Sequence, residues 1–212
     1  VIEKDETMKD HLEGILDKEQ IIFVDVLKSN IEKELEKRNI DPKKTLVVGN
    51  LPYYITSPIF RKFFGNGEQK YFGGLFMIQE EVGQKIKTNN SPLGQKEGSG
   101  EISKHKKSFL RRLLNHTYNI EYKKTVGAKC FKPAPKVKSC LVQFQKKEKA
   151  IDLNFDKLFE FLDLYSQFSR KTLGAINKIL QKQQKNTFPI PEDLKKKRLE
   201  ELSWENIKKI LK

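Results

Sequence analysis

Three short apolar runs rich in β-branched and aromatic residues constrain the fold of this chain more than any other feature. They span Ile21 to Val24, Leu46 to Val48 and Tyr71 to Ile78, and helix-compatible sequence separates the first two. Strands that alternate with helices form parallel sheets with helices packed against them. The pattern therefore predicts an α/β fold built on a parallel sheet.

The segments after the third run predict a helix, a loop, a second helix and a late strand. Residues 80–90 are helix-compatible, and residues 91–107 are rich in Gly, Ser and Lys, which predicts a flexible loop. Residues 109–120 favour a helix. Residues 139–145 alternate apolar and polar side chains, which predicts an antiparallel strand.

The pattern changes to helices alone after residue 149. Phe161, Tyr165 and Phe168 share one helical face, as in a helix that packs on a core. We therefore predict two domains: residues 1–149 contain the sheet, and residues 150–212 form a small all-helical domain.

Net charge indicates the partners that such a chain attracts. Its 212 residues carry a formal net charge of +14, which attracts polyanions such as nucleic acid or an anionic membrane surface. The plainer alternative is a lysine-rich genome as the source of part of this excess. No apolar stretch approaches the roughly 20 residues of a membrane span, and no signal-peptide pattern opens the chain. We expect a soluble, cytoplasmic protein without a membrane partner.

The residue types that most often bind metals lack the spacing of a metal site. Cys130 and Cys140 are not in the paired arrangement of a zinc site, and we expect both to be reduced structural thiols. His105 and His116 have no partner ligands at a recognisable spacing. We expect no metal and give neither histidine a catalytic role.

Polar acceptors stand at the ends of three successive predicted strands. Glu3 closes a strand at the start of the sequence, Asp25 follows the run Ile21 to Val24, and Asn50 follows the run Leu46 to Val48. Ligands of open α/β sheets bind at this edge, where an acid can accept hydrogen bonds from ribose hydroxyls or from an exocyclic amine. Two plainer interpretations stay open: Glu3 as a solvated acid at a strand end, and Asp25 as a helix cap.

The stretch NLPYYITSPIF follows the run Leu46 to Val48 and begins with an amide, a proline and two tyrosines. Pro52 fixes its own backbone angle and restricts Leu51, which sets the direction of the carbonyl after Asn50. An amide oxygen and a nearby carbonyl can then accept both hydrogens of an aromatic amine. Tyr53 offers a ring on which a base can stack.

Asn-Leu-Pro-Tyr in this stretch resembles the catalytic motif of the S-adenosylmethionine-dependent rRNA adenine N6-dimethyltransferases, the KsgA/RsmA family. Further segments are similar to that family in its order: VIEKD and FVDVL at cofactor-binding strand ends, FMIQEEVGQKI at a helix entry, CFKPAPKVKSCLVQF at an aromatic segment, and YSQFSRKTLGAINKIL at the start of a helical domain. The resemblance covers nearly the whole chain.

The resemblance implies a Rossmann-like class I methyltransferase sheet followed by a small C-terminal helical domain. In the family, the first strand and its glycine-rich loop precede the segment that matches Val1. We therefore expect this chain to be an N-terminally truncated fragment that binds the cofactor weakly and is inactive by itself. Residues 89–108 also depart from the family's shorter loop, which ends in Tyr-Gly where Lys107 and Ser108 stand here.

The resemblance also implies the site residues and the cofactor. The catalytic residues are Asn50, Leu51, Pro52 and Tyr53. The residues that bind the cofactor are Glu3, Asp25, Val26 and Asn50. Phe131 joins Tyr53 in stacking on the target base, the cofactor is S-adenosylmethionine with S-adenosylhomocysteine as its product, and no metal is implied.

Basic residues beside the aromatic segment and at the start of the helical domain are candidates for contacts with RNA phosphates. They are Arg111, Arg112, Lys132, Lys136, Lys138, Arg170 and Lys171. For any one of them, a solvated surface position is the plainer interpretation.

We therefore expect a monomeric enzyme that methylates N6 of two adjacent adenines near the 3′ end of small-subunit rRNA, acting on immature small subunits in ribosome biogenesis. An alternative within the same fold is an erythromycin-resistance-type methylase acting on 23S rRNA, although its motif usually reads Asn-Ile-Pro-Tyr. A non-catalytic RNA-binding assembly or transcription factor is the alternative from another class.

Overall fold

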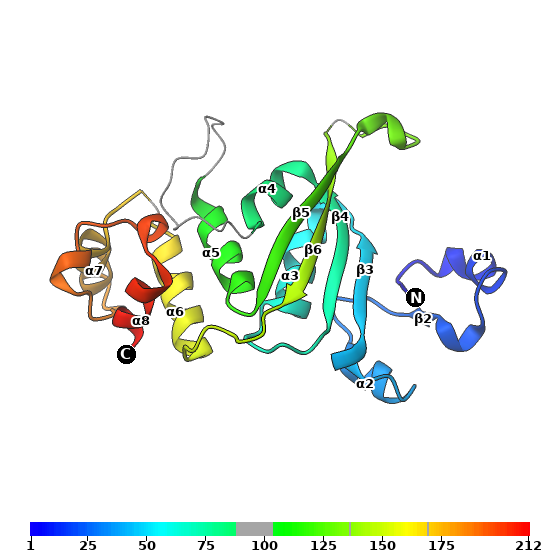
Figure 1. Cartoon of the computed structure of the whole chain (residues 1–212), viewed down its shortest axis with the longest axis horizontal. Helices are drawn as coiled ribbons and strands as arrows, with labels where there is room; N and C mark the ends of the chain where they lie inside the picture. The colour runs from blue at the N-terminus through cyan, green and yellow to red at the C-terminus, as the bar shows by residue number, and fades with distance from the viewer. Residues whose placement is uncertain (88–103, 136, 169) are drawn as a thin grey trace.

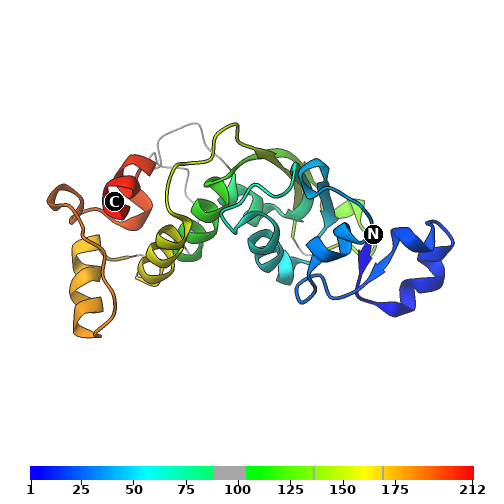
Figure 2. The ribbon, with the colours of Figure 1, turned by 90° about the horizontal axis from the view of Figure 1, so that it is seen from below.

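The computed structural model describes residues 1–87, 104–135, 137–168 and 170–212, without the side chains of residues 104–108. Three parts follow one another in space: an N-terminal segment, a central sheet with its helices, and a C-terminal group of helices (Figure 1). The view from below shows the same arrangement, with the first and last residues in opposite halves of the molecule (Figure 2).

The central sheet has four strands in the order β3-β4-β6-β5. Strand β3 (Leu46–Asn50) pairs in parallel with β4 (Gly73–Gln79). Strand β6 (Ser139–Lys146) runs antiparallel between β4 and β5 (Tyr118–Val126). Of the three runs predicted to form a parallel sheet, the second and third pair in parallel here, and the late antiparallel strand is confirmed.

A second, two-stranded sheet is formed by β1 (Ile2–Glu3) and β2 (Ile22–Phe23), which pair in parallel. It is not hydrogen-bonded to the central sheet. The strand β3 is therefore an edge strand, and its Val48 side chain is 66% exposed. The α/β sheet of this chain consists of two separate parts.

One face of the central sheet carries the main core. Helices α3 (Thr56–Phe64), α4 (Glu80–Ile86) and α5 (Lys104–Asn115) supply residues to the same buried cluster as alternate residues of the strands. The rings of Phe60, Phe64 and Phe144 meet at centroid distances of 4.5 to 4.8 Å. Such packing of large rings fixes α3, and therefore the chain segment just before it, against the sheet.

Two predicted boundaries in the middle of the chain are wrong. Residues 118–120 were expected to continue a helix, but they begin β5, where Tyr118 and Ile120 point into the core and Asn119 is exposed. Residues 104–107 were expected to be loop and instead begin α5. The remainder of the loop predicted over 91–107 lies outside the described residues.

Short helices and turns connect the elements before the C-terminal part. They are α1 (Lys9–Glu13), α2 (Ile31–Glu36) and the 3-10 turns Glu6–Met8, Lys18–Gln20, Pro42–Lys44, Tyr53–Ile55 and Ala128–Cys130. Within the described residues, no helix is both long enough and apolar enough to cross a bilayer.

The C-terminal part is helical and has its own buried cluster. It contains α6 (Phe155–Ser166), α7 (Leu173–Lys182), α8 (Trp204–Leu211) and the 3-10 turns Glu192–Leu194 and Leu199–Glu201. Asn154 caps α6 by accepting a hydrogen bond from the Lys157 amide, and Ser203 caps α8 in the same way.

Helix α5 joins the two cores. Its Leu114 packs in the cluster beneath the sheet, whereas its Phe109 packs against the C-terminal cluster. At the end of α5 the buried His116 ring lies against Phe155 and Trp204, and burial lowers the pKa of this histidine. His116 is therefore neutral at physiological pH and belongs to the packing between the two parts.

Candidate active site

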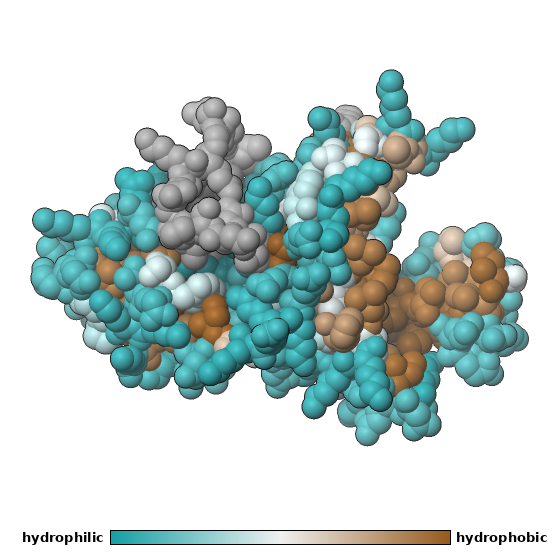
Figure 3. Space-filling model, in the orientation of Figure 1, coloured by the Kyte–Doolittle hydropathy of each residue, from teal (hydrophilic) through white to brown (hydrophobic). Residues whose placement is uncertain are grey.

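A cavity of about 1530 Å³ lies between the two sheets. Its lining runs along β3 from Leu46 to Asn50 and includes the strand-end residues Glu3 and Asp25. Small-molecule pockets commonly have volumes of roughly 300–1,000 Å³, so a nucleoside-sized ligand has room here. Apolar residues gather on the surface along β3 and the neighbouring N-terminal segment (Figure 3). Six residues predicted for the site line this one cavity: Glu3, Asp25, Val26, Asn50, Leu51 and Pro52.

Glu3 is held in place by the backbone that follows β1. Its Oε1 accepts hydrogen bonds from the amides of Lys4, at 2.6 Å, and Asp5, at 2.8 Å. The carboxylate is thereby fixed at the strand end that borders the cavity. An acid in this position is a suitable acceptor for ribose hydroxyls.

Asp25 makes two contacts, one with each carboxylate oxygen. Its Oδ1 accepts a hydrogen bond from the Leu27 amide at 2.9 Å, and its Oδ2 lies 3.2 Å from the Lys4 ammonium. The Leu27 amide, followed by Lys4, lowers the pKa of Asp25, so the group is a carboxylate at neutral pH. The helix-cap interpretation is wrong, because a turn follows Asp25 and Asn30 is the residue that caps α2. The Oδ1 bond stabilises that turn, and the same residue lines the cavity.

Asn50 ends β3 with an exposed side chain beside the cavity. The next residue continues the ladder, because the Leu51 amide donates to the Met77 carbonyl at 3.1 Å. Leu51 packs close to Gly49: a Cβ there would stand 2.8 Å from Cδ2 of Leu51, so a larger residue would displace the end of that side chain. Leu51 thus extends the pairing of β3 with β4 by one residue.

The two carbonyls after Asn50 differ in their partners. The Pro52 carbonyl accepts the Ile55 amide at 3.1 Å and the Thr56 hydroxyl at 3.4 Å, which closes the turn before α3. Within the described residues, no group donates a hydrogen bond to the Leu51 carbonyl. Leu51 therefore supplies the backbone acceptor that is better suited to a ligand.

The structure separates the two adjacent tyrosines. Tyr54 is 85% exposed and lines the cavity, a role that sequence reasoning missed. Tyr53 is half-buried on another side of the motif, where its hydroxyl lies 2.8 Å from Oγ of Ser139. Phe131 follows the turn in the β5–β6 connection, and within the described residues no ring contact joins it to Tyr53.

The predicted RNA-contacting residues lie in different environments. Lys132, Lys138, Arg170 and Lys171 are exposed, and Arg111 is half-buried on α5. Lys136 lies outside the described residues. Arg112 is only 2% exposed, and its Nη2 donates to the carbonyls of Leu199 and Leu202, each at 2.8 Å. The prediction of an RNA contact for Arg112 is therefore wrong, because its guanidinium binds backbone inside the protein.

A second basic segment lies next to Arg170 and Lys171. Thr172 forms an antiparallel bridge with Arg198, and the Leu173 amide donates to the Lys197 carbonyl at 2.8 Å. This pairing brings residues 195–198, Lys-Lys-Lys-Arg, beside the start of α7. Sequence reasoning missed this segment, because local patterns give no sign of the pairing.

The groups around the cavity suit a nucleoside ligand. Two carboxylates can accept hydrogen bonds from hydroxyl and amine groups, and the side chains of Ile22, Val24 and Val26 form an apolar wall that suits a base. In the described part of the chain, no group of three or more His, Cys, Asp or Glu residues is placed to hold a metal ion. The residues present thus fit an adenosine-containing cofactor.

Solved structures with a similar fold support this interpretation of the architecture. A dimethyladenosine transferase from Plasmodium falciparum superposes with a TM-score of 0.65 at 21% identity, over 99% of this chain and 79% of that one. The 23S rRNA methyltransferase ErmE gives a TM-score of 0.54 at 16% identity, over 99% of this chain and 80% of the other. At these identities the likeness shows the fold alone.

Sequence relatives are more specific. The chain is 32% identical over 168 residues to a ribosomal RNA small subunit methyltransferase A from Hydrogenobaculum sp., covering 79% of this chain and 57% of the relative. It is 33% identical over 162 residues to the protein of that name from Protochlamydia amoebophila, covering 76% and 52%. The chain thus spans about half the length of these curated relatives.

The family model named Ribosomal RNA adenine dimethylase matches residues 1–212. This match extends through the sheet, the cavity and the C-terminal helices. Together with the relatives above, it shows that the chain belongs to the ribosomal RNA adenine dimethylase family.

Proposed function

We propose that the protein transfers methyl groups from S-adenosylmethionine to N6 of two adjacent adenines near the 3′ end of small-subunit rRNA, in ribosome biogenesis. One observation carries the proposal: the strand-end residues Glu3, Asp25 and Asn50 border one cavity in a member of an rRNA adenine dimethylase family. S-adenosylmethionine supplies an electrophilic methyl group on a sulfonium. No residue of the chain has to form a covalent bond with the methyl group.

The chain's own residues bind the cofactor and orient the amine. Glu3 accepts hydrogen bonds from the ribose hydroxyls, and Asp25 accepts one from the amine of the cofactor's adenine. The side-chain oxygen of Asn50 and the Leu51 carbonyl accept the two hydrogens of the target amine. These bonds draw the nitrogen lone pair out of conjugation and direct it at the methyl group, and the amine loses its proton after attack.

The target adenine has to leave the RNA stack before its amine can reach Asn50. Tyr53 and Phe131 would stack on the two faces of the extruded base. Among the described residues Phe131 makes no ring contact with Tyr53, so the second ring would have to approach the base when RNA binds. Exposed cations such as Lys132, Lys138, Arg170 and Lys171 would contact phosphates.

Methyl transfer by the complete protein tests the proposal. Immature small ribosomal subunits, large-subunit rRNA and unrelated RNA would be incubated with labelled S-adenosylmethionine. We expect N6-dimethyladenosine in the small-subunit rRNA alone. Methylation confined to 23S rRNA would favour the erythromycin-resistance-type alternative, and RNA binding without methyl transfer would favour a non-catalytic factor.

Replacing Asp25 separates its role in the turn that follows it from its proposed cofactor role. Asp25→Ser keeps a short acceptor for the Leu27 amide, whereas Asp25→Ala removes it. We expect both variants to bind S-adenosylmethionine about tenfold more weakly, because both lose the carboxylate. Only Asp25→Ala should also lose about 1 kcal/mol of stability. Calorimetric titration and urea unfolding measure these quantities. Parent-like cofactor binding by Asp25→Ser would leave stabilisation of the turn as the only role.

Replacing Arg170 and Lys171 together by Gln tests the RNA-binding surface at the start of α7. We expect weaker binding to small-subunit rRNA, and a slope of log affinity against log salt that flattens by about 0.7 to 0.9 for each phosphate that the variant no longer neutralises. A matched control removes the same charge from exposed Lys178 and Lys182, further along α7. Equal flattening in both double variants would mean that only net charge matters.

A further inference from the structure

A hydrogen bond links the catalytic motif to the central sheet. The Tyr53 hydroxyl lies 2.8 Å from Oγ of Ser139, although the two residues are 86 positions apart. Tyr53 begins the turn that follows Pro52, and Ser139 is the first residue of β6. The bond therefore ties the end of the Tyr53 side chain to a strand that lies much later in the sequence.

Ser139 offers a buried point of attachment. It is 1% exposed and is the first residue of β6, the strand between β4 and β5, where it pairs with their last residues, Gln79 and Val126. Neighbouring polar contacts reinforce the same corner: the Glu80 amide donates to the Lys138 carbonyl at 3.0 Å. The Glu80 carboxylate accepts hydrogen bonds from Tyr122, at 2.8 Å, and Thr125, at 2.9 Å. These contacts and the strand pairing hold the backbone that carries the Ser139 hydroxyl.

Tyr53 itself is less constrained by packing. It is half-buried, and it is absent from the aromatic contacts that order the core rings among the described residues. A stacking ring with one free end rotates about its two side-chain torsions. Anchoring the hydroxyl removes that freedom before the base arrives. Such pre-organisation of a site residue raises the rate of methyl transfer more than it raises folding stability.

We propose that Ser139 is a positioning residue that fixes the Tyr53 ring in the orientation in which the target adenine stacks. This inference rests on the proposed function, because Tyr53 has to be the stacking ring. It assigns no contact between Ser139 and the substrate. It also gives Tyr53 a reason to be tyrosine, since phenylalanine would stack equally well but would lack the anchor.

A double-mutant cycle in the complete protein tests the coupling. Tyr53→Phe and Ser139→Ala should each slow single-turnover methylation of immature small subunits by about tenfold, and the double variant should be no slower than either single one. Cofactor affinity should stay within about twofold of the parent, because neither residue lines the cavity. Ser139→Thr keeps the hydroxyl and should restore most of the rate. Ser57→Ala, on the exposed surface of α3, serves as the matched serine control.

Two results would overturn the inference: a parent-like rate for Tyr53→Phe, which removes only a part-exposed hydroxyl and leaves the fold intact, or multiplicative losses in the double variant.

A measurement without RNA separates this outcome from failure of the proposed function. In protein labelled with 3-fluorotyrosine, the Tyr53 resonance is assigned by its loss in Tyr53→Phe. It should change from that of an ordered ring to that of an averaging ring in Ser139→Ala. An unchanged resonance would contradict positioning even if the parent methylates no RNA.

Discussion

Asn50→Ala should slow methyl transfer by the complete protein by about a hundredfold or more while leaving RNA affinity and stability close to those of the parent. The expected factor follows from the loss of one hydrogen-bond acceptor that is oriented toward the reacting amine. Loss of one preorganised oxyanion-hole group costs at least about 2.7 kcal/mol of transition-state stabilisation, and we expect a similar cost here. The side chain is exposed at the end of β3, so its removal leaves no buried group unpaired. The loss should therefore appear in methyl transfer and not in RNA binding or folding.

Single-turnover methylation, RNA binding and urea unfolding measured on one set of variants check this division. Asn154→Ala is the matched control, because that asparagine caps α6 far from the cavity. It should show the opposite pattern, a loss of about 1 kcal/mol of stability with an unchanged rate. Turnover of Asn50→Ala within threefold of the parent would remove Asn50 from the catalytic step.

The parts of the site that could be predicted are those fixed by strand ends. Glu3, Asp25 and Asn50 each follow an apolar run, and parallel strands necessarily bring their carboxyl ends to one edge. All three residues line one cavity, although β1 and β2 form a sheet separate from the one that contains β3. Tyr54 was missed because a single sequence does not tell which of two adjacent rings a turn directs toward the cavity and which toward β6.

Strand β5 could not be predicted because its stability comes from pairing rather than from local preference. Tyr118 and Ile120 face the core while Asn119 is exposed, a short alternation that directly follows a helical segment. The alternation then breaks at a bulge between Tyr122 and Lys124. Only the partner strand β6 makes this segment extended, and that partner lies beyond the turn.

Charge was the least predictable feature, because basic side chains look alike in a sequence whether they meet solvent, RNA or a carbonyl. Arg111 and Arg112 are neighbours, yet a helix turns successive residues about 100° apart, so one is half-buried and the other is inside. A signal did exist: Phe109, Arg112 and His116 follow the spacing of a buried helical stripe. Weighing periodicity above charge would have placed Arg112 in the core.

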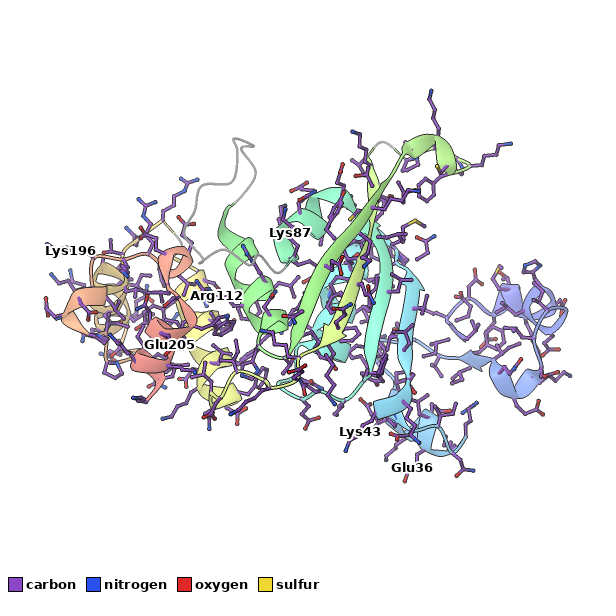
Figure 4. The ribbon with its side chains drawn as sticks, in the orientation of Figure 1. Glu36, Lys43, Lys87, Arg112, Lys196 and Glu205 are labelled. Atoms are coloured by element: carbon purple, nitrogen blue, oxygen red, sulfur yellow. The ribbon has the colours of Figure 1, made fainter. Side chains whose placement is uncertain are left out.

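Arg112→Met should destabilise the protein by about 3 to 5 kcal/mol, the largest stability loss that we expect from a single substitution here. Methionine can fill much of the volume, but the carbonyls of Leu199 and Leu202 would stay buried after losing their charged donor. The side chain reaches from α5 toward the C-terminal segment, so its loss should loosen the join between the two cores (Figure 4). Urea unfolding monitored by the single tryptophan, Trp204, would report this change.

The control variants decide between a structural and an RNA-binding arginine. Arg112→Lys keeps the charge, but a single ammonium does not reproduce the planar fork that serves two carbonyls at once, so it should also lose stability. Arg111→Met makes the same chemical change one residue earlier, at a half-buried position, and should cost much less. At a temperature where all variants are folded, Arg112→Lys should keep the parent's salt slope for RNA binding. A flattened slope in Arg112→Met with parent-like stability would mean that the guanidinium contacts phosphate after all, because an interior donor cannot be removed without a cost to folding.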